Sequence, residues 1–103
     1  MRTVMVRYQV RPDAVAENEA LIRKVFDQLA REKPQGLRYQ SIKLADGVSF
    51  VHVATHDAEG VNPLTQTAAF KEFVSGIRAR CVEPPVTLEA QVVGTYSGLS
   101  PWA

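Results

Sequence analysis

Residues 37–56 read LRYQSIKLADGVSFVHVATH, and this stretch contains two strand-like runs on either side of one turn signal. The runs cover residues 37–45 and 48–56. Asp46-Gly47 separates them, and this dipeptide accepts the positive φ angles of a two-residue type I′ turn. We therefore expect a β-hairpin whose register follows by counting outward from the turn. The expected facing pairs are Ala45 and Val48, Lys43 and Phe50, Ser41 and His52, and Tyr39 and Ala54.

The segments around this hairpin complete a regular order of elements. Residues 3–11 alternate in polarity and predict a strand, while residues 13–32 carry apolar side chains at helical spacing, with Asp13 as a candidate cap. A second amphipathic helix is predicted from residue 64 or 65 to about 80, and a last strand over residues 86–96. The order predicts an α+β fold, a ferredoxin-like βαββαβ sandwich whose four-stranded antiparallel sheet has both helices on one face and its first and third strands at the centre. Residues 1–96 form this domain, and residues 97–103 are a C-terminal tail.

Composition and charge exclude several classes of function. The 103 residues include 12 Lys+Arg and 11 Asp+Glu, and this balance provides no basic surface for nucleic acid. There is no apolar run of the length a membrane span needs and no signal peptide, so we expect no membrane partner and a cytoplasmic location. A single cysteine, Cys81, excludes an intrachain disulfide.

One face of the predicted sheet has no helix to cover it. We assign to the helix side alternate residues of all but the second strand: Val4, Val6, Tyr8, Val10, Phe50, His52, Ala54, His56, Val86, Leu88, Ala90 and Val92. The apolar residues left for the other side are Met5, Ile42, Leu44, Val51, Val53 and Val93. An apolar centre with a polar rim is typical of an association surface, which predicts a homodimer through the sheet faces, closed as a barrel with the helices outside. The alternative is a solvated sheet with scattered apolar residues.

Three segments resemble the dimeric α+β barrel superfamily, in particular the antibiotic biosynthesis monooxygenase-like proteins. They are VMVRYQVRPD at residues 4–13, SFVHVATH at residues 49–56 and AAFKEFVSGI at residues 68–77. The resemblance implies a dimeric α+β barrel. It also implies cofactor-independent oxygenation, in which an electron-rich aromatic or polyketide-like substrate is deprotonated and reacts directly with oxygen.

The chain departs from the family pattern at the second helix. His56 stands where the family commonly has a strand-end aromatic residue, and Ala69-Phe70 matches its alanine-aromatic pair. Phe73 and Ile77 replace two helix histidines. Because haem-cleaving relatives use a helix histidine as the iron ligand, the resemblance does not favour a haem protein, and we expect no cofactor.

Polar side chains on the helix side of the sheet are the candidate site. His56 is the first candidate for a catalytic base and His52 the second, since an imidazole can remove a proton from a phenol. A tyrosine hydroxyl can hold the resulting oxyanion. Each residue also has a structural interpretation: His56 as a surface histidine at a strand end, and His52 as a core histidine bonded to Ser41.

The remaining site predictions concern substrate contacts and metals. We expect Tyr8, Tyr39, Asn62, Phe70 and Phe73 to contact substrate, although the tyrosines also fit a core role and Asn62 a cap before the second helix. The two histidines lie about 13 Å apart on one strand and cannot share a metal. No carboxylate has a recognisable ligand spacing, so we predict no metal site.

Two functions of different classes follow from these residues. The first is a cofactor-independent monooxygenase-like enzyme acting on a small aromatic or polyketide-like substrate in a pocket between helix and sheet. The second is a homodimeric protein that binds a small ligand, or acts in stress, without catalysis. An interior filled by side chains would leave only a structural role.

Overall fold

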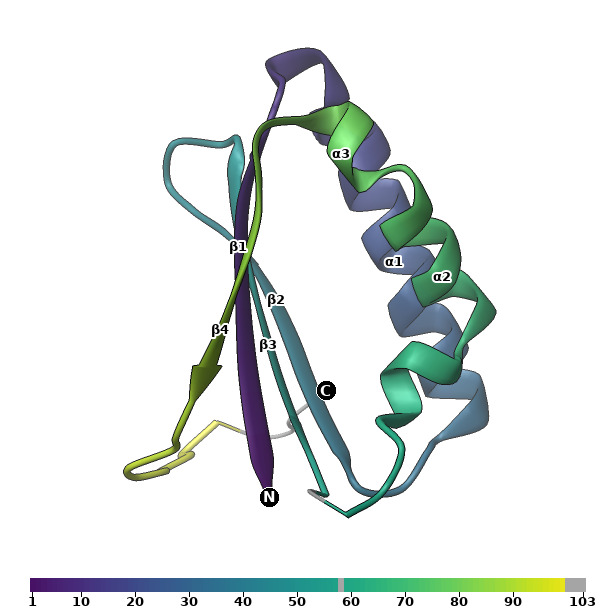
Figure 1. Ribbon diagram of the computed structural model, residues 1–103, viewed down its shortest axis with the longest axis vertical. Helices are drawn as coiled ribbons and strands as arrows, with labels where there is room; N and C mark the ends of the chain where they lie inside the picture. The colour runs from purple at the N-terminus through teal and green to yellow at the C-terminus, as the bar shows by residue number, and fades with distance from the viewer. Residues whose placement is uncertain (58, 100–103) are drawn as a thin grey trace.

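The computed structural model describes residues 1–57 and 59–99, which form a sheet with a layer of helices on one face (Figure 1). The strands are β1 (Arg2–Val10), β2 (Leu37–Lys43), β3 (Ser49–His56) and β4 (Cys81–Ala90). The helices are α1 (Val15–Glu32), α2 (Ala68–Ser75) and α3 (Ile77–Arg80), with short 3-10 turns η1 (Pro12–Ala14) and η2 (Pro63–Gln66). Within this described part, none of the helices has the length and apolarity that a membrane crossing requires.

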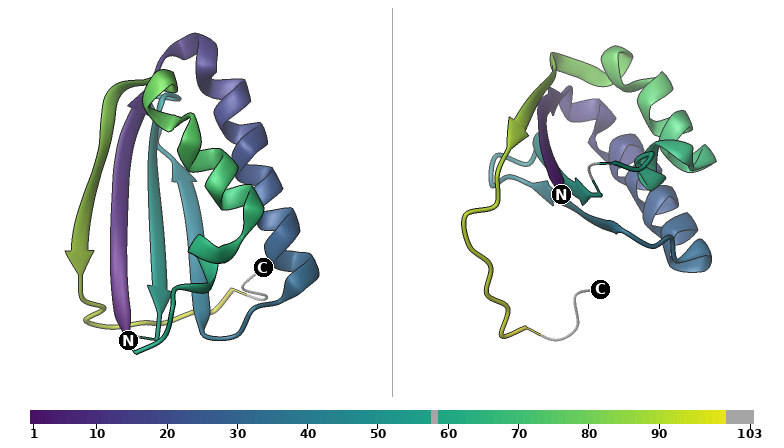
Figure 2. Two further views of the ribbon diagram at one scale, coloured as in Figure 1. Left: turned by 45° about the vertical axis from the view of Figure 1, so that its right-hand side comes forward. Right: turned by 60° about the horizontal axis from the view of Figure 1, so that its bottom comes forward.

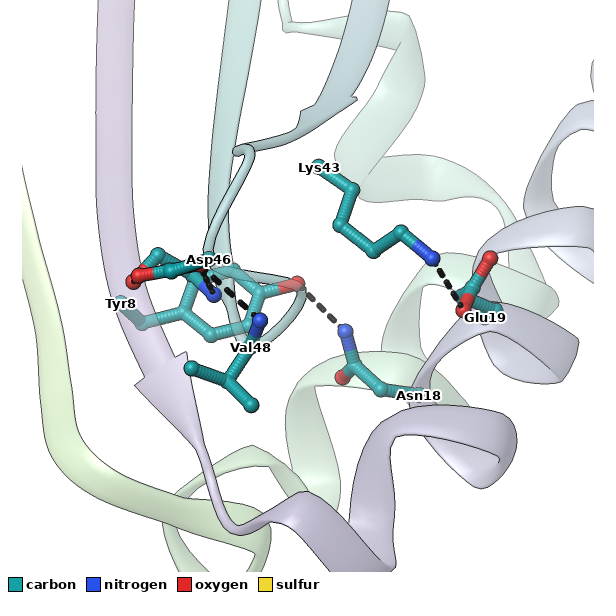
Figure 3. Close-up of polar contacts among 7 residues, drawn as sticks. Tyr8, Asn18, Glu19, Lys43, Asp46 and Val48 are labelled. Carbon is teal, nitrogen blue, oxygen red and sulfur yellow. Dashed lines mark hydrogen bonds and ion pairs between the residues drawn. The ribbon is translucent and has the colours of Figure 1, made fainter.

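The sheet topology confirms the predicted fold class. The strand order is β2-β3-β1-β4, and each neighbouring pair is antiparallel. The first and third strands are therefore central, and the helices cover the same face of the sheet (Figure 2). An ion pair of 3.2 Å between Lys43 and Glu19 links the edge strand β2 to α1 (Figure 3).

The β2–β3 hairpin has the predicted register but a different turn. Lys43 pairs with Phe50, Ser41 with His52 and Tyr39 with Ala54, as expected. The turn runs from Leu44 to Gly47, whose N–H donates to the Leu44 carbonyl at 3.0 Å, and only Gly47 has a positive φ. The Asp46 carboxylate accepts from the N–H groups of residues 48 and 49, so it stabilises the loop through its side chain (Figure 3). The prediction of a two-residue type I′ turn was wrong, although the longer loop keeps the same pairing.

Both helical segments differ from the prediction near their ends. Asp13 does not cap α1; it lies in η1 and pairs with Arg11 at 3.1 Å. The second helix is not continuous, because η2 ends at Gln66 and Gly76 separates α2 from α3. The Thr67 side chain accepts from the Phe70 N–H and caps α2.

The last strand is the largest correction to the sequence prediction. β4 begins at Cys81 and ends at Ala90, and described residues 91–99 contain no helix or strand, which leaves Val92 and Val93 outside the sheet. Val86 pairs with Arg7 and Leu88 with Met5, so they and Ala90, which pairs with Thr3, lie on the face away from the helices. The expected orientation of this strand was wrong because alternation defines two sets of residues but not which set faces inward. The predicted boundary between domain and tail stays a prediction, and residues 100–103 lie outside the described residues.

The core lies between the sheet and the helix layer. Phe50 is 2% exposed, and its ring stacks on that of Tyr8 with 5.5 Å between centroids. The other buried apolar residues come from all layers: Val10, Ala14, Val25, Ala54, Leu64, Phe73 and Ile77.

Replacing Phe50 by alanine should destabilise the fold strongly. We expect Phe50→Ala to lower the free energy of unfolding by about 3–5 kcal/mol, because it removes buried apolar contacts and leaves a cavity. Urea unfolding followed by circular dichroism measures the change. Val93→Ala is the matched control, since Val93 is 98% exposed and its truncation should change stability by less than about 0.5 kcal/mol. Equal losses in the two variants would contradict this assignment of the core.

Candidate functional site

A cavity of about 300 Å³ lies between the sheet and the segment that contains η2, α2 and α3. Most of its wall is apolar, and a few polar side chains reach into it, which is the usual composition of a small-molecule site. The polar lining residues are Tyr8, Tyr39, His52, Asn62, Thr65 and Thr87. The apolar lining residues are Val4, Val6, Ala54, Leu64, Phe70, Phe73, Val74, Ile77 and Pro85.

His52 is the centre of the polar cluster in this cavity. It lies in the middle of β3, opposite Val6 on β1 and Ser41 on β2, and it is 5% exposed. Its Nε2 lies 2.7 Å from the Tyr8 hydroxyl. Its Nδ1 lies 2.5 Å from the Tyr39 hydroxyl and 2.9 Å from Ser41 Oγ. Both ring nitrogens therefore have partners, as a buried imidazole requires.

Burial determines the ionisation of this cluster. It lowers the pKa of His52 to about 4, so the ring is neutral at pH 7. Burial also raises the pKa of Tyr39 to about 12, against a smaller opposite effect of the Ser41 hydrogen bond. The pKa of Tyr8 is raised further by burial, although the hydrogen bond from Asn18 opposes the shift. At neutral pH the cavity thus presents hydroxyl groups and a neutral imidazole.

Two buried residues of the helix layer, Asn18 and Arg80, support the cluster. Asn18 on α1 is fully buried, and its Nδ2 donates to the Tyr8 hydroxyl at 2.9 Å (Figure 3). Arg80 is 3% exposed; its Nε donates to Asn18 Oδ1 at 3.1 Å and its Nη2 to the Phe73 carbonyl at 2.9 Å. The guanidinium also lies over the Phe73 ring, 5.2 Å from its centroid.

Gly76 makes room for the Arg80 side chain. A Cβ at this position would lie 2.9 Å from Arg80 Nη1, so a larger residue would displace the guanidinium. The glycine that separates α2 from α3 therefore also leaves space for the buried cation.

Comparison with known proteins supports the same architecture. No protein-family profile and no curated protein matches the sequence. Solved structures do match: an antibiotic biosynthesis monooxygenase has a TM-score of 0.74 and 20% identity over 91% of this chain and 100% of its own. A Nitrosomonas europaea protein assigned to the same group has a TM-score of 0.76 and 18% identity, over 91% of this chain and 100% of its own. SnoaB from Streptomyces nogalater, described as a cofactor-independent oxygenase, has a TM-score of 0.66 and 20% identity, over 91% of this chain and 94% of its own.

The chain has the antibiotic biosynthesis monooxygenase fold. The resemblance predicted from three short segments is confirmed at this level. Because the identities are 20% or lower, the likeness to these structures shows the fold alone, and the chemistry of this chain depends on the residues of its own cavity.

Within this monooxygenase fold, most of the residues predicted from sequence meet at one cavity. Tyr8, Tyr39, His52, Phe70 and Phe73 all line it. Asn62 also lines it, and its Oδ1 accepts from the Leu64 N–H at 3.0 Å, so it caps the 3-10 turn η2, whereas Thr67 caps α2.

His56 occupies a different environment. Its ring is 8% exposed, its Nδ1 lies 2.9 Å from the Asp57 carbonyl, and it is not among the described residues that line the cavity. Its assignment as a base stays a prediction, and His52 is the histidine that lines the cavity.

Neither Asn18 nor Arg80 is among the site residues predicted from the sequence. A signal for Asn18 was present, since it falls in the apolar stripe of its helix, one turn before Leu21 and Ile22. An amide in such a stripe needs buried partners. Among the described residues no group of three His, Cys, Asp or Glu side chains is arranged to hold a metal ion.

The low pKa of His52 predicts a specific dependence of stability on pH. The unfolded chain takes up a proton near pH 6.5, whereas the folded ring resists protonation until about pH 4. The contribution of neutral His52 to the free energy of unfolding is therefore complete above pH 6.5. About 3 kcal/mol of it is lost as the pH falls toward 4.

The measurement is urea unfolding of wild type and His52→Gln across this range. The variant lacks the titrating group, so its free energy of unfolding should fall less between pH 6.5 and pH 4 than that of wild type. The carboxylates titrate in both proteins, and the difference between the two curves isolates His52. Identical curves would show that His52 is not a buried neutral imidazole.

Proposed function

We propose that the cavity binds a small aromatic or polyketide-like molecule and that the protein is a cofactor-independent monooxygenase-like enzyme. The observation that carries this proposal is the convergence of Tyr8, Tyr39 and His52 on one largely apolar cavity of about 300 Å³. Phe70 and Phe73 supply apolar and aromatic wall for a flat ring. The similarity of the fold to SnoaB, described as a cofactor-independent oxygenase, supports the same reaction class.

The ionisation of the cavity suggests how such a reaction proceeds. His52 is a weak base at pH 7, so the substrate must be acidic enough to bind as its phenolate or enolate. Hydroxyl donors in a dry cavity stabilise that oxyanion. Reaction of a substrate CH2 group with O2 then yields a carbonyl and water. One oxygen atom enters the substrate, the other leaves as water, and the electrons come from the two C–H bonds, so the reaction needs no external reductant.

A second function, ligand binding without catalysis, is favoured by one observation. Both nitrogens of His52 already have partners, and its lowered pKa leaves no free general base in the described cavity wall. The two functions differ in a measurable way, because an enzyme consumes oxygen in proportion to product and a binding protein does not.

Filling the cavity from its rim should abolish ligand binding and turnover. Thr87 lines the cavity from the edge strand and lies outside the hydrogen-bonded cluster. We expect Thr87→Trp to weaken binding of a naphthol probe at least about tenfold, since the indole occupies the space of the ligand. Fluorescence titration measures binding, and an oxygen electrode with product analysis measures turnover.

The control for this variant is Val82→Trp on the same strand, where the residue is 59% exposed and does not line the cavity. It should leave both readings unchanged. Binding without oxygen uptake would favour the binding protein, and undiminished binding in Thr87→Trp would refute the cavity as the ligand site.

We also propose that the protein is a homodimer through the uncovered sheet face. The corrected orientation of β4 adds Val86 and Leu88, 56% and 52% exposed, to the apolar residues of β1, β2 and β3 on this face. The resulting apolar strip crosses all four strands: Met5, Ile42, Val51, Val53, Val86 and Leu88. An apolar strip of this extent favours burial against a second copy.

A charge at the middle of this strip should prevent association. Val53 pairs with Met5 and Gln40 on its two neighbouring strands, so Val53→Lys places an ammonium group at the centre of the proposed interface. Sedimentation should give twice the mass of one chain for wild type and the mass of one chain for the variant. The control Val61→Lys, in a loop where the residue is 72% exposed, should remain dimeric. A wild type that sediments as one chain at micromolar concentration would refute the dimer.

A further inference from the structure

The buried polar side chains behind the cavity form one continuous chain of hydrogen bonds, from Arg80 through Asn18 and Tyr8 to His52 and then Tyr39. We propose that Arg80 and Asn18 are positioning residues that hold His52 in the Nδ1–H tautomer and thereby aim the Tyr39 O–H proton into the cavity. The cavity then selects ligands that carry an acceptor oxygen. This selection rests on the proposed function, whereas the tautomer is a property of the protein alone.

The direction of the chain is determined at its Arg80 end. A guanidinium has five N–H donors and no acceptor, so the atom of Asn18 that faces Arg80 Nε at 3.1 Å must be the oxygen. The amide nitrogen of Asn18 consequently faces Tyr8 and donates to its hydroxyl oxygen at 2.9 Å. A flipped amide would place two donors face to face in a fully buried site.

The Tyr8 hydroxyl transmits this direction to the imidazole. Its oxygen accepts from Asn18, and the other partner of the hydroxyl is His52 Nε2, at 2.7 Å. The Tyr8 proton therefore goes to Nε2, because a second donor there would leave the buried Tyr8 proton without an acceptor. A neutral imidazole carries one N–H, so the proton of His52 resides on Nδ1.

The Nδ1–H group decides the orientation of Tyr39. It donates toward the Tyr39 oxygen at 2.5 Å and Ser41 Oγ at 2.9 Å, and it cannot accept a proton from either hydroxyl. Because the Tyr39 oxygen accepts from Nδ1–H, the Tyr39 proton cannot be directed at His52. Tyr39 lines the cavity and Ser41 does not, so that proton points into the cavity.

The charge of Arg80 maintains this order. None of the carboxylates in the described residues forms an ion pair with Arg80, and its side chain is almost completely buried. An uncompensated cation at one end of the chain favours the arrangement in which each dipole points its negative end toward Arg80. A carbonyl or phenolate oxygen beside Tyr39 accepts the Tyr39 proton and extends this series of hydrogen bonds. A ligand that has only donors or only carbon atoms at this point cannot accept it.

The tautomer of His52 can be measured directly by nitrogen NMR on protein labelled at histidine. The chain has two histidines, and His56→Gln assigns the signals of His52. At pH 7 we expect the shifts of a neutral ring protonated at Nδ1 and unprotonated at Nε2. A ring protonated at Nε2 in wild type would overturn the proposal. This test requires no substitution of Arg80, Asn18 or Tyr8.

The isosteric variant Asn18→Asp should reverse the direction of the hydrogen bonds from residue 18 through Tyr8 to His52. A carboxylate only accepts, so it would take hydrogen bonds from both Arg80 and the Tyr8 hydroxyl. The Tyr8 oxygen would then accept from His52, and the tautomer should change from Nδ1–H to Nε2–H. Asn62→Asp is the matched control: Asn62 lines the same cavity, is outside the chain, and already uses its oxygen as an acceptor. A His52 tautomer that is unaffected by Asn18→Asp would contradict the positioning role of Asn18.

Ligand selectivity tests the consequence for the cavity. The probes are 2-acetonaphthone, which has a carbonyl acceptor, and 2-ethylnaphthalene, which has nearly the same shape and no acceptor. The ratio of their affinities should fall about tenfold from wild type to Asn18→Asp, because the Tyr39 proton turns toward His52. An unchanged ratio with a changed tautomer would reject the selectivity. If neither probe binds wild type while the tautomer is as expected, the proposed function fails and the positioning role of Arg80 and Asn18 stands.

Discussion

A histidine buried in the middle of a strand needs a hydrogen-bond partner for each ring nitrogen, and this constraint organises the interior of the protein. His52 meets it with Tyr8 from one neighbouring strand and with Tyr39 and Ser41 from the other. These partners are themselves buried or half-buried and need partners of their own. Tyr8 bonds to Asn18, Asn18 bonds to Arg80, and the Arg80 guanidinium donates to the Phe73 carbonyl. No buried side-chain polar atom of the described residues is left without a partner. A network satisfied throughout holds its members in one arrangement, whereas a gap in it would cost stability.

The topology brings these residues together from distant parts of the sequence. Antiparallel pairing places Tyr8, His52 and Tyr39 on the helix side of three adjacent strands. The first helix contributes Asn18, and the short helix after Gly76 contributes Arg80. The same packing leaves a cavity that Tyr8, Tyr39 and His52 line together with core residues such as Phe73. Core stability and the chemistry of the cavity therefore depend on common side chains.

The hairpin was the part of the fold that local sequence could determine. Turn residues and alternating polarity gave the right pairing of Ser41 with His52, and the order of elements gave the right strand order. The edge strand could not be oriented in this way, because alternation along β4 defines two sets of residues but not which set faces the helices. Six of the seven site residues predicted from the sequence line the cavity, and strand periodicity put three of them, Tyr8, Tyr39 and His52, on one face of the sheet. The role of Arg80 could not be predicted from the sequence. Its burial depends on contacts with Asn18 on α1, which is remote in sequence, and with the Phe73 carbonyl, which it reaches only in the folded state.

The chemistry available to the cavity follows from what burial does to its ionisable groups. A free histidine would be a base near neutral pH, but desolvation here keeps His52 neutral and keeps both tyrosines protonated. The polar wall thus offers hydroxyl donors in place of a base, and it stabilises an anion that forms elsewhere or arrives with the ligand. Such a cavity distinguishes ligands by their acidity: an acidic phenol or enol is already ionised at neutral pH, and the hydroxyl donors offset part of the cost of burying its charge. A weakly acidic one would need a proton acceptor that the wall lacks. In the proposed function, the acidity of the bound molecule, more than the identity of any single side chain, separates a substrate from a ligand that is only bound.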